Sequence, residues 1–259
     1  MKTAFFDSGI GGLSVLHEAR RQMPEEDFIF YADCIHAPYG EKTPADVQRY
    51  VDRAVDFLIE NGAQAIVLAC NTATSVACTA LRRRLSVPVI GMEPAAKMAL
   101  DLDGTRRVLV AATPVTTRGE KLHELMVRVD RQHLVDLLAL PQLVRFAEAD
   151  DFSRETVLPY LRRALAPFDL SAYSSLVLGC THFNYFKDSF RALLPAGMHL
   201  LDGNAGTVRQ LKRRLQETGA GGGGTGSTAY YFSGRPAGAD ELSRISRLME
   251  RLDRMRAIE

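Results

Sequence analysis

Two cysteines stand at matching places in the sequence. Residues 65–72, AIVLACNT, and residues 175–182, SLVLGCTH, are apolar runs that end in a cysteine, Cys70 and Cys180, followed by polar residues. A pair of thiols facing one carbon atom could remove a proton from one side and return one to the other. Either cysteine alone is equally well explained as a buried packing residue. Their similar surroundings favour the pair.

The position of each cysteine also bears on its charge. Each apolar run is typical of a strand, and the residues after the cysteine are typical of the start of a helix. Helix N-termini offer unpaired N–H groups, so we expect a thiolate to be favoured at Cys70, beside Asn71 and Thr72. The same argument holds at Cys180, where His182 could hold or relay a proton.

A glycine-rich turn follows the first apolar run. Residues 7–12, DSGIGG, lack the third glycine of a dinucleotide fingerprint, since Ser14 stands there, and they lack the lysine of a P-loop. The turn can instead let a carboxylate or an amino acid approach the backbone, with Ser8 donating to it. Asp7 is either a helix N-cap or a site carboxylate that binds a substrate ammonium, and both interpretations stay open.

Polar residues also stand in two later segments. Pro38, Tyr39 and Gly40 lie in a loop after the second apolar run, and alone they are typical of a turn. Thr113 and Thr116 follow another apolar run and offer hydroxyl groups to a site, although helix capping explains them equally well.

The two remaining cysteines are assigned to packing. Cys34 and Cys78 lack both the symmetry and the polar flanks of the first pair, although Asp33 or His36 near Cys34 could serve a site. No cluster of His, Cys and carboxylate residues has the spacing of metal ligands, so we expect no metal.

The elements that must position these residues follow a βα rhythm, because short apolar runs alternate with amphipathic stretches. Strands are predicted at Thr3–Phe6, Phe28–Tyr31, Ala65–Leu68, Val87–Ile90, Arg107–Val110, Val135–Leu138, Leu176–Leu178 and His199–Leu201. Helices are predicted at Gly12–Gln22, Pro44–Asn61, Thr72–Leu85, Ala95–Leu100, Arg118–Val129, Arg154–Leu165, Phe183–Leu194 and Ala205–Glu217.

The repeated strand and cysteine imply two related halves. Such halves pack about a pseudo-two-fold axis, and α/β sheets bind ligands at the carboxyl ends of their strands. We therefore predict an α/β fold of two similar three-layer domains with mostly parallel sheets and an active site in the interdomain cleft. The first domain would comprise residues 1–92 and 205–259, and the second residues 93–204.

The end of the chain offers less chemistry. Gly219–Ser227, GAGGGGTGS, is typical of a flexible surface loop without a function. Tyr230–Phe232 could form one more strand, and Ala239–Arg256 is predicted as a helix. Its apolar stripe is interpreted as core or dimer contact and comprises Leu242, Ile245, Leu248, Met249, Leu252 and Met255.

Composition excludes several classes of partner. The 259 residues contain 32 Lys and Arg against 31 Asp and Glu, a net charge of +1, so no global field recruits nucleic acid or an anionic membrane. The N-terminus has only a short apolar run before Asp7, and no later stretch could span a bilayer. We expect a cytoplasmic protein with a small polar ligand and free thiols.

Six segments together carry a resemblance to a known family. The chain resembles the aspartate/glutamate racemase superfamily, and its glutamate racemases in particular, from about Ala4 to Asp202. The segments are FFDSGIGGLSVL, YADCIHAPYGEKT, VLACNTAT, PVIGMEPAAKMA, AATPVT and LVLGCTHF, in that order. The resemblance implies two similar α/β domains with glutamate between them, no cofactor or metal, a role in supplying D-glutamate for peptidoglycan, and a homodimer.

The resemblance also implies roles for single residues. Cys70 would deprotonate the D-enantiomer and Cys180 the L-enantiomer, assisted by Asp7 and His182 respectively. Glu148, in LVRFAE, matches a glutamate near that histidine. Substrate-binding positions would be Asp7, Ser8, Pro38, Tyr39, Gly40, Cys70, Asn71, Thr72, Thr113, Thr116, Cys180, Thr181 and His182.

Departures from the family pattern leave alternatives open. Phe183 and Asn184 stand where Tyr-Pro is common, and Cys34 stands where threonine is usual. A racemase for aspartate, another amino acid or a hydantoin, or a decarboxylase of the same superfamily, therefore stays possible. A dithiol redox or ligand-binding protein is the alternative from another class, although the spacing is not CxxC.

Overall fold

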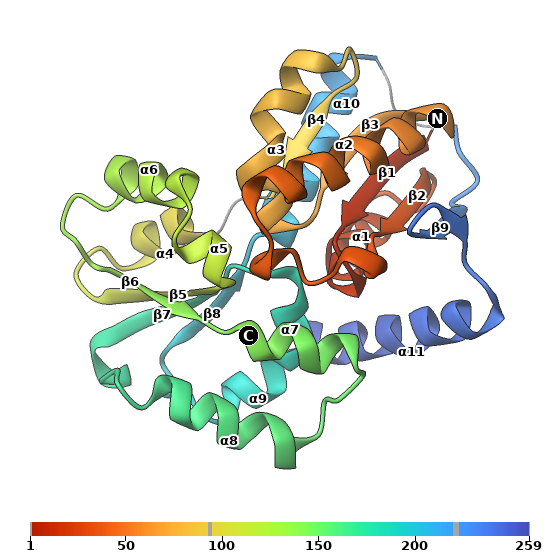
Figure 1. Ribbon diagram of the computed structural model, residues 1–259. Coiled ribbons are helices and arrows are strands. Elements are labelled where there is room, and N and C mark those ends of the chain that lie inside the picture. The colour runs from red at the N-terminus through yellow and green to blue at the C-terminus, as the bar shows by residue number, and fades with distance from the viewer. Residues whose placement is uncertain (1, 93–94, 220–222, 259) are drawn as a thin grey trace.

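The computed structural model describes residues 2–92, 95–219 and 223–258 (Figure 1). Its strands are β1 (Lys2–Asp7), β2 (Asp27–Ala32), β3 (Ala63–Leu68), β4 (Val89–Gly91), β5 (Arg107–Ala112), β6 (Val135–Ala139), β7 (Tyr173–Leu178), β8 (His199–Asp202), β9 (Thr228–Phe232) and β10 (Arg235–Pro236). Its α-helices are α1 (Leu13–Gln22), α2 (Pro44–Glu60), α3 (Asn71–Arg84), α4 (Ala96–Leu102), α5 (Pro114–Thr117), α6 (Glu120–Val129), α7 (Pro141–Glu148), α8 (Arg154–Leu165), α9 (Lys187–Arg191), α10 (Asn204–Glu217) and α11 (Ala239–Arg256). Short 3-10 helices are η1 (Ile10–Gly12), η2 (Cys34–His36), η3 (Tyr39–Glu41), η4 (Leu170–Ala172) and η5 (Thr181–Phe186).

Two sheets repeat one topology. One has the order β10-β9-β2-β1-β3-β4 and the other the order β6-β5-β7-β8. In the first, β1 pairs in parallel with β2 and β3, and β3 pairs with β4; in the second, β5 pairs in parallel with β6 and β7, and β7 pairs with β8. The predicted fold class of two similar, mostly parallel α/β halves is confirmed, whereas the predicted domain boundaries stay a prediction.

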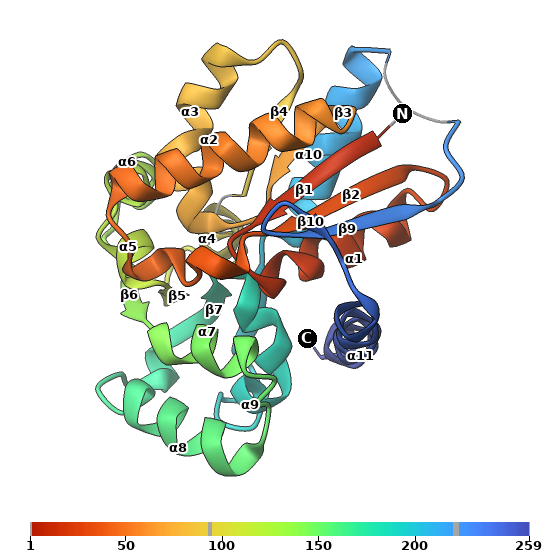
Figure 2. The ribbon, with the colours of Figure 1, turned by 45° about the vertical axis from the view of Figure 1, so that its right-hand side comes forward.

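Each sheet is covered on both faces because its strands alternate their side chains. In β1, Phe6 packs with α2 and α3, whereas Phe5 faces the side that holds α1, α10 and α11. In β5, Val110 belongs to a small core beside α4, and Leu109 faces α7 and α8. The core around Phe5 and Leu109 is continuous, so one apolar cluster joins the two halves. Figure 2 shows α7, α8 and α9 of the second half below the sheet of the first.

The structure differs from the predicted elements at two places. Helix α7 was not predicted, because its buried residues, Leu143, Val144 and Ala147, span little more than one turn, and eight residues are too few to establish a helical period. The helix predicted at Phe183–Leu194 is instead η5 followed by the short α9. The reason is that Phe183, Tyr185 and Phe186 are all buried, which one face of an α-helix does not allow for three residues so close in sequence.

The C-terminal region packs against both halves. The apolar stripe of α11 is mostly core, since Ile245, Leu248, Leu252 and Met255 are buried, but Leu242 is 46% exposed. Of the segment Gly219–Ser227, residues 220–222 lie outside the described residues. Its last residues, Thr225 and Ser227, donate to the carboxylate of Asp27 at the start of β2. No described helix is long and apolar enough to cross a membrane.

Candidate active site

The two cysteines of the sequence repeat stand at equivalent strand ends. Cys70 follows β3 by two residues and is the N-cap of α3, where its Sγ accepts from the backbone N–H of Ala73 at 3.4 Å. Cys180 follows β7 by two residues and is the N-cap of η5. Both are buried. Burial is the largest cause that raises the pKa of Cys70, and the charge of Cys180 adds a smaller effect in the same direction.

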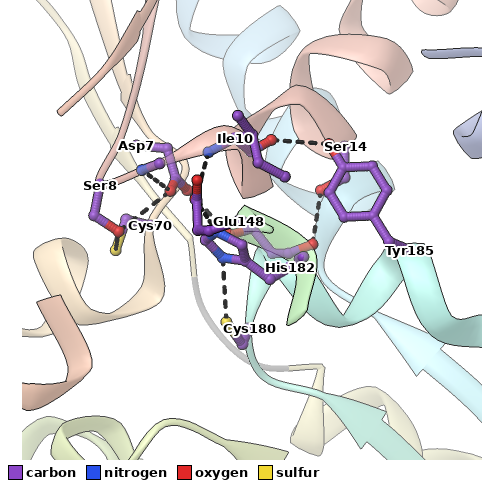
Figure 3. A network of polar contacts seen from close by, with 12 residues as sticks. Asp7, Ser8, Ile10, Ser14, Cys70, Glu148, Cys180, His182 and Tyr185 are labelled. Carbon is purple, nitrogen blue, oxygen red and sulfur yellow. Dashed lines mark hydrogen bonds and ion pairs between the residues drawn. The ribbon is translucent and has the colours of Figure 1, made fainter. Parts of the chain in front are cut away.

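Cys180 begins a chain of three titratable groups (Figure 3). Its Sγ lies 3.8 Å from His182 Nδ1, and His182 Nε2 lies 2.7 Å from Glu148 Oε1. Glu148 ends α7, and the same Oε1 accepts from the backbone N–H of Ile10 in the first half at 2.9 Å. The second cysteine is therefore tied to a histidine, a carboxylate and the glycine-rich turn.

Charge in this chain is concentrated on the ring and the carboxylate. Burial disfavours the imidazolium, but hydrogen bonds and charge from Cys180 and Glu148 outweigh it and raise the pKa of His182 well above its ordinary value. Burial also disfavours the charged form of Glu148 and so acts to raise its pKa. His182, the N–H of Ile10 and the charge of Arg244 outweigh burial and bring this pKa below its usual value. A positive ring therefore stands between the sulfur and a carboxylate.

Cys70 has a different partner chain. Ser8 Oγ lies 3.5 Å from Cys70 Sγ and 3.4 Å from Asp7 Oδ1. Asp7 ends β1, and its carboxylate accepts from the N–H of Gly9 and from the hydroxyl of Thr181, each at 3.0 Å. It caps none of the described helices, so of the two interpretations of Asp7 the N-cap is wrong.

Burial dominates the electrostatics around Cys70. It raises the pKa of Asp7 to about 6, against the lowering effects of His182, Gly9 and Thr181. Burial, with the charge of Asp7, raises the pKa of Cys70 to about 12, although Ala73 and Ser8 act in the opposite direction. The expected thiolate at Cys70 is therefore wrong, because the effect of the helix N-terminus on its pKa is weaker than that of burial.

The glycine-rich turn is needed for close packing of the protein's own side chains. A Cβ on Gly9 would collide with the carboxylate of Glu148, and one on Gly11 would collide with the ring of His182 and the hydroxyl of Thr181. The turn was predicted to admit a ligand to the backbone. In the structure it admits the catalytic candidates of the other half.

A cluster of hydroxyl groups lies beside the first cysteine. Thr72 Oγ1, at the start of α3, lies 3.1 Å from Thr113 Oγ1 and 3.3 Å from Thr116 Oγ1, and all three residues are buried. Thr113 also caps α5, so the capping interpretation is confirmed, and its role in the site stays a prediction. Asn71 Oδ1 is buried and has no hydrogen-bond partner among the described residues. It is an acceptor available to a ligand.

The loop with Pro38, Tyr39 and Gly40 joins this cluster. A Cβ on Gly40 would lie 2.7 Å from Cβ of Thr113, so the loop packs directly against the second half. Tyr39 is buried, and its hydroxyl donates to Asp33 Oδ2 at 2.6 Å. Asp33 thus holds Tyr39, and with it the loop, through this hydrogen bond.

The structure brings the predicted site residues together and adds others. Sequence reasoning missed Arg244 of α11, whose charge acts on Glu148, and Tyr185, whose hydroxyl donates to the carbonyl of Ile10 at 2.8 Å. Nothing in the spacing of either residue signalled a role. Cys78 is buried in α3, and Cys34 is partly buried against the main core, as assigned.

Comparison with known proteins places this arrangement in a family. The family model described as Asp/Glu/Hydantoin racemase matches residues 13–211, well over half of the chain. The chain belongs to this racemase family. The resemblance drawn from the sequence motifs is thereby confirmed, and the protein is an isomerase.

Relatives within the racemase family match over nearly the full length. A glutamate racemase of Lachnospira eligens is 52% identical, and the match covers 100% of both chains. The solved glutamate racemase of Thermus thermophilus, in complex with beta-chloro-D-alanine, is 34% identical with a TM-score of 0.77, covering 97% of this chain and 92% of that chain. The Escherichia coli glutamate racemase, in complex with L-glutamate and the activator UDP-MurNAc-Ala, is 30% identical with a TM-score of 0.82, covering 96% and 94%.

Proposed function

We propose that this racemase interconverts L-glutamate and D-glutamate by moving the α-proton between Cys70 and Cys180. The observation that carries the proposal is the pair of buried cysteines at equivalent strand ends, each with its own chain to a carboxylate. Inversion at Cα by proton transfer needs a base on one face and an acid on the other. Full-length relatives named glutamate racemases support glutamate as the substrate.

The chemical step starts from the protonation state of Cys70. Cys70 is a thiol, because burial and the charge of Asp7 raise its pKa to about 12, and the positive ring of His182 lies 3.8 Å from the sulfur of Cys180, the base in this direction. The Cys180 thiolate removes the α-proton of L-glutamate, and the Cys70 thiol donates its proton to the opposite face. D-Glutamate results, with Cys180 left as the thiol and Cys70 as the thiolate.

The carbanion must be stabilised by the protein's own groups. The first N–H groups of α3, at Asn71 and Thr72, have no partner within the helix and can bind the α-carboxylate. Hydroxyls of Thr72, Thr113 and Thr116 add donors in a buried site, where fixed dipoles act strongly on developing charge. The unpaired Oδ1 of Asn71 can accept from the substrate ammonium.

Before the next cycle, Cys180 must lose a proton and Cys70 must gain one, so protons must be exchanged near each sulfur. Asp7 has a pKa of about 6 and reaches Cys70 through Ser8, so it can hold a proton near neutral pH. His182 does the same for Cys180. Pro38, Tyr39, Gly40 and Thr181 would complete the substrate pocket, with Tyr39 held by Asp33 and Thr181 held by Asp7.

The test is loss of optical activity without added cofactor. Purified protein is incubated with L-glutamate and separately with L-aspartate, and circular dichroism follows each solution. We expect the signal to decay to zero with glutamate and to persist with aspartate. Decay only with aspartate would overturn the substrate, and no decay with either would overturn the reaction.

Variants of the two cysteines test the mechanism. Cys70→Ala and Cys180→Ala should each abolish racemisation of both enantiomers, because each direction uses both sulfurs. Racemisation surviving in either variant would refute the scheme. Thiol titration with and without reductant separates the dithiol alternative, which requires a reversible Cys70–Cys180 disulfide.

We also infer a cytoplasmic homodimer that supplies D-glutamate for peptidoglycan synthesis. Exposed apolar side chains support association, among them Ile35, Val127 and Leu242. Light scattering after size exclusion should give about twice the mass of 28.6 kDa, and the monomer mass at micromolar concentration would overturn the dimer.

A further inference from the structure

Beyond the groups that touch substrate, one cation of the C-terminal helix reaches the chain behind Cys180. We propose that Arg244 of α11 is a positioning residue for Glu148 and His182, a role that rests on the proposed function. The Arg244 guanidinium donates to the backbone carbonyl of Glu148 at 2.7 Å, and one of its nitrogens lies 3.9 Å from Glu148 Oε2. Arg244 therefore contacts both the backbone and the carboxylate of Glu148, the residue that is hydrogen-bonded to His182.

The first part of this role is geometric. Carbonyl groups in the last turn of a helix have no partner within it, and Arg244 binds those of Ala147 and Glu148 at the end of α7. The next turn is closed by Asp150, whose φ of 53° is in the left-handed region that favours glycine. Arg244 Nε donates to both carboxylate oxygens of Asp150, at 2.9 and 3.1 Å. The ion pair holds a strained helix end in place.

The second part is electrostatic. Arg244 is 21% exposed, and its charge contributes to lowering the pKa of Glu148. Keeping Glu148 ionised keeps it an acceptor for His182 Nε2, which stabilises the imidazolium beside Cys180. Cys70 contacts Ser8 and through it Asp7 instead, so the influence of Arg244 falls chiefly on Cys180 and reaches Cys70 only through the charges of His182 and Glu148 near Asp7.

The arrangement also explains why this cation stands on α11. Arg251, seven residues further along the same helix, donates to the carbonyl of Tyr185 in η5 at 2.8 Å and packs 4.5 Å above the ring of Phe152. Residues seven apart lie on nearly the same face of a helix. That face of α11 thus holds α7 through Arg244 and η5 through Arg251, the two elements that carry Glu148 and His182.

A one-way reaction separates the two faces of the site. Racemisation cannot, because an equilibrium constant of one forces kcat/KM to change equally in both directions. With 3-chloroglutamate, the base takes the α-proton, the Cα–Cβ double bond forms and chloride leaves Cβ with its bonding electrons. The enamine then tautomerises to an imine, and hydrolysis of the imine gives 2-oxoglutarate and ammonium. The rate is measured as released chloride. Each enantiomer therefore reports on one cysteine only.

The matched variants are Arg244→Met and Arg247→Met. Arg247 is on the same helix, its side chain is 63% exposed, and it lies 4.0 Å from Asp150. We expect Arg244→Met to release chloride from the L-enantiomer about tenfold more slowly and from the D-enantiomer within about twofold of the unaltered protein. Arg247→Met should match the unaltered protein with both. Cys180→Ser and Cys70→Ser calibrate the assay, since they should slow the L- and D-reactions respectively.

Two further results decide between positioning and mere stability. In Arg244→Met, the acid limb of the pH–rate profile for the L-enantiomer should shift to higher pH, because the pKa of Glu148 rises when the cation is removed. Arg244→Lys, which keeps the charge but not the planar fork, should recover part of the L-rate. Equal losses with both enantiomers, or no loss with either, would overturn the role of Arg244. Failure of the unaltered protein to racemise glutamate would instead overturn the proposed function.

Discussion

At the scale of single residues, the two cysteines share a position but not an environment. Cys180 faces a cationic ring that is backed by Glu148, whereas Cys70 faces a hydroxyl that is backed by Asp7. Burial and the charge of Asp7 raise the pKa of Cys70, while the positive ring of His182 lies beside the sulfur of Cys180. The two faces of the site are therefore asymmetric: Cys70 must lose its proton before it can act as the base for the D-enantiomer.

The buried carboxylate of Asp7 should make stability depend on pH. The pKa of Asp7 is raised from its ordinary value of 3.8 to about 6 in the folded protein, so the folded state holds the proton more tightly. The resulting stabilisation is present below pH 3.8 and is lost as the pH rises through 6. The Asp7→Asn variant should not show this pH-dependent loss of stability, because asparagine carries no charge and still offers an acceptor to the N–H of Gly9.

Urea unfolding at two pH values measures the effect. Between pH 4.5 and 7.5, the free energy of unfolding of Asp7→Asn should gain about 2 kcal/mol relative to the unaltered protein, because each pKa unit corresponds to about 1.4 kcal/mol. Racemisation should be lost in the same variant. A difference between the two proteins that is the same at both pH values would contradict the raised pKa.

At the scale of elements, the site could be predicted in part from the sequence. Cys70 and Cys180 were found because a strand end repeats its apolar run and its cysteine. Glu148 came only from the family resemblance, because α7 is too short to show periodicity. Arg244 could not be found, since the apolar stripe of α11 fixes which face is buried and not what an arginine beside that face will reach across the chain.

The turn between β1 and α1 should tolerate no side chain at Gly11. An added methyl group would collide with His182 and Thr181, which belong to the other half and are held by Glu148 and Asp7. Overpacking of this kind costs about 1–3 kcal/mol. We expect Gly11→Ala to lower the free energy of unfolding by that amount and to reduce kcat.

Gly197→Ala is the matched control, since a Cβ there meets no heavy atom within 4 Å. It should leave both the unfolding midpoint in urea and kcat close to those of the unaltered protein. Equal behaviour of the Gly11 and Gly197 variants would show that the turn can widen and that its glycine serves another purpose.

At the scale of the whole molecule, the two halves depend on each other. One apolar cluster includes Phe5 and Leu109 from the two central strands, and α11 of the C-terminal region bonds to residues of α7 and η5. A catalyst that must hold two sulfurs on opposite sides of one carbon atom gains from such a shared core, because independent motion of the halves would move the acid away from the base.

This continuity predicts that the halves unfold together. Amide hydrogen exchange can be followed separately in β1 and in β5, the central strands of the two sheets. We expect the free energies of opening for the slowest amides of the two strands to agree within about 1 kcal/mol, because neither sheet can expose its face without breaking the shared cluster. If β5 exchanged through a much lower-energy opening while β1 stayed protected, the second half would be a separate folding unit and the shared core would contribute little to holding the two cysteines in register.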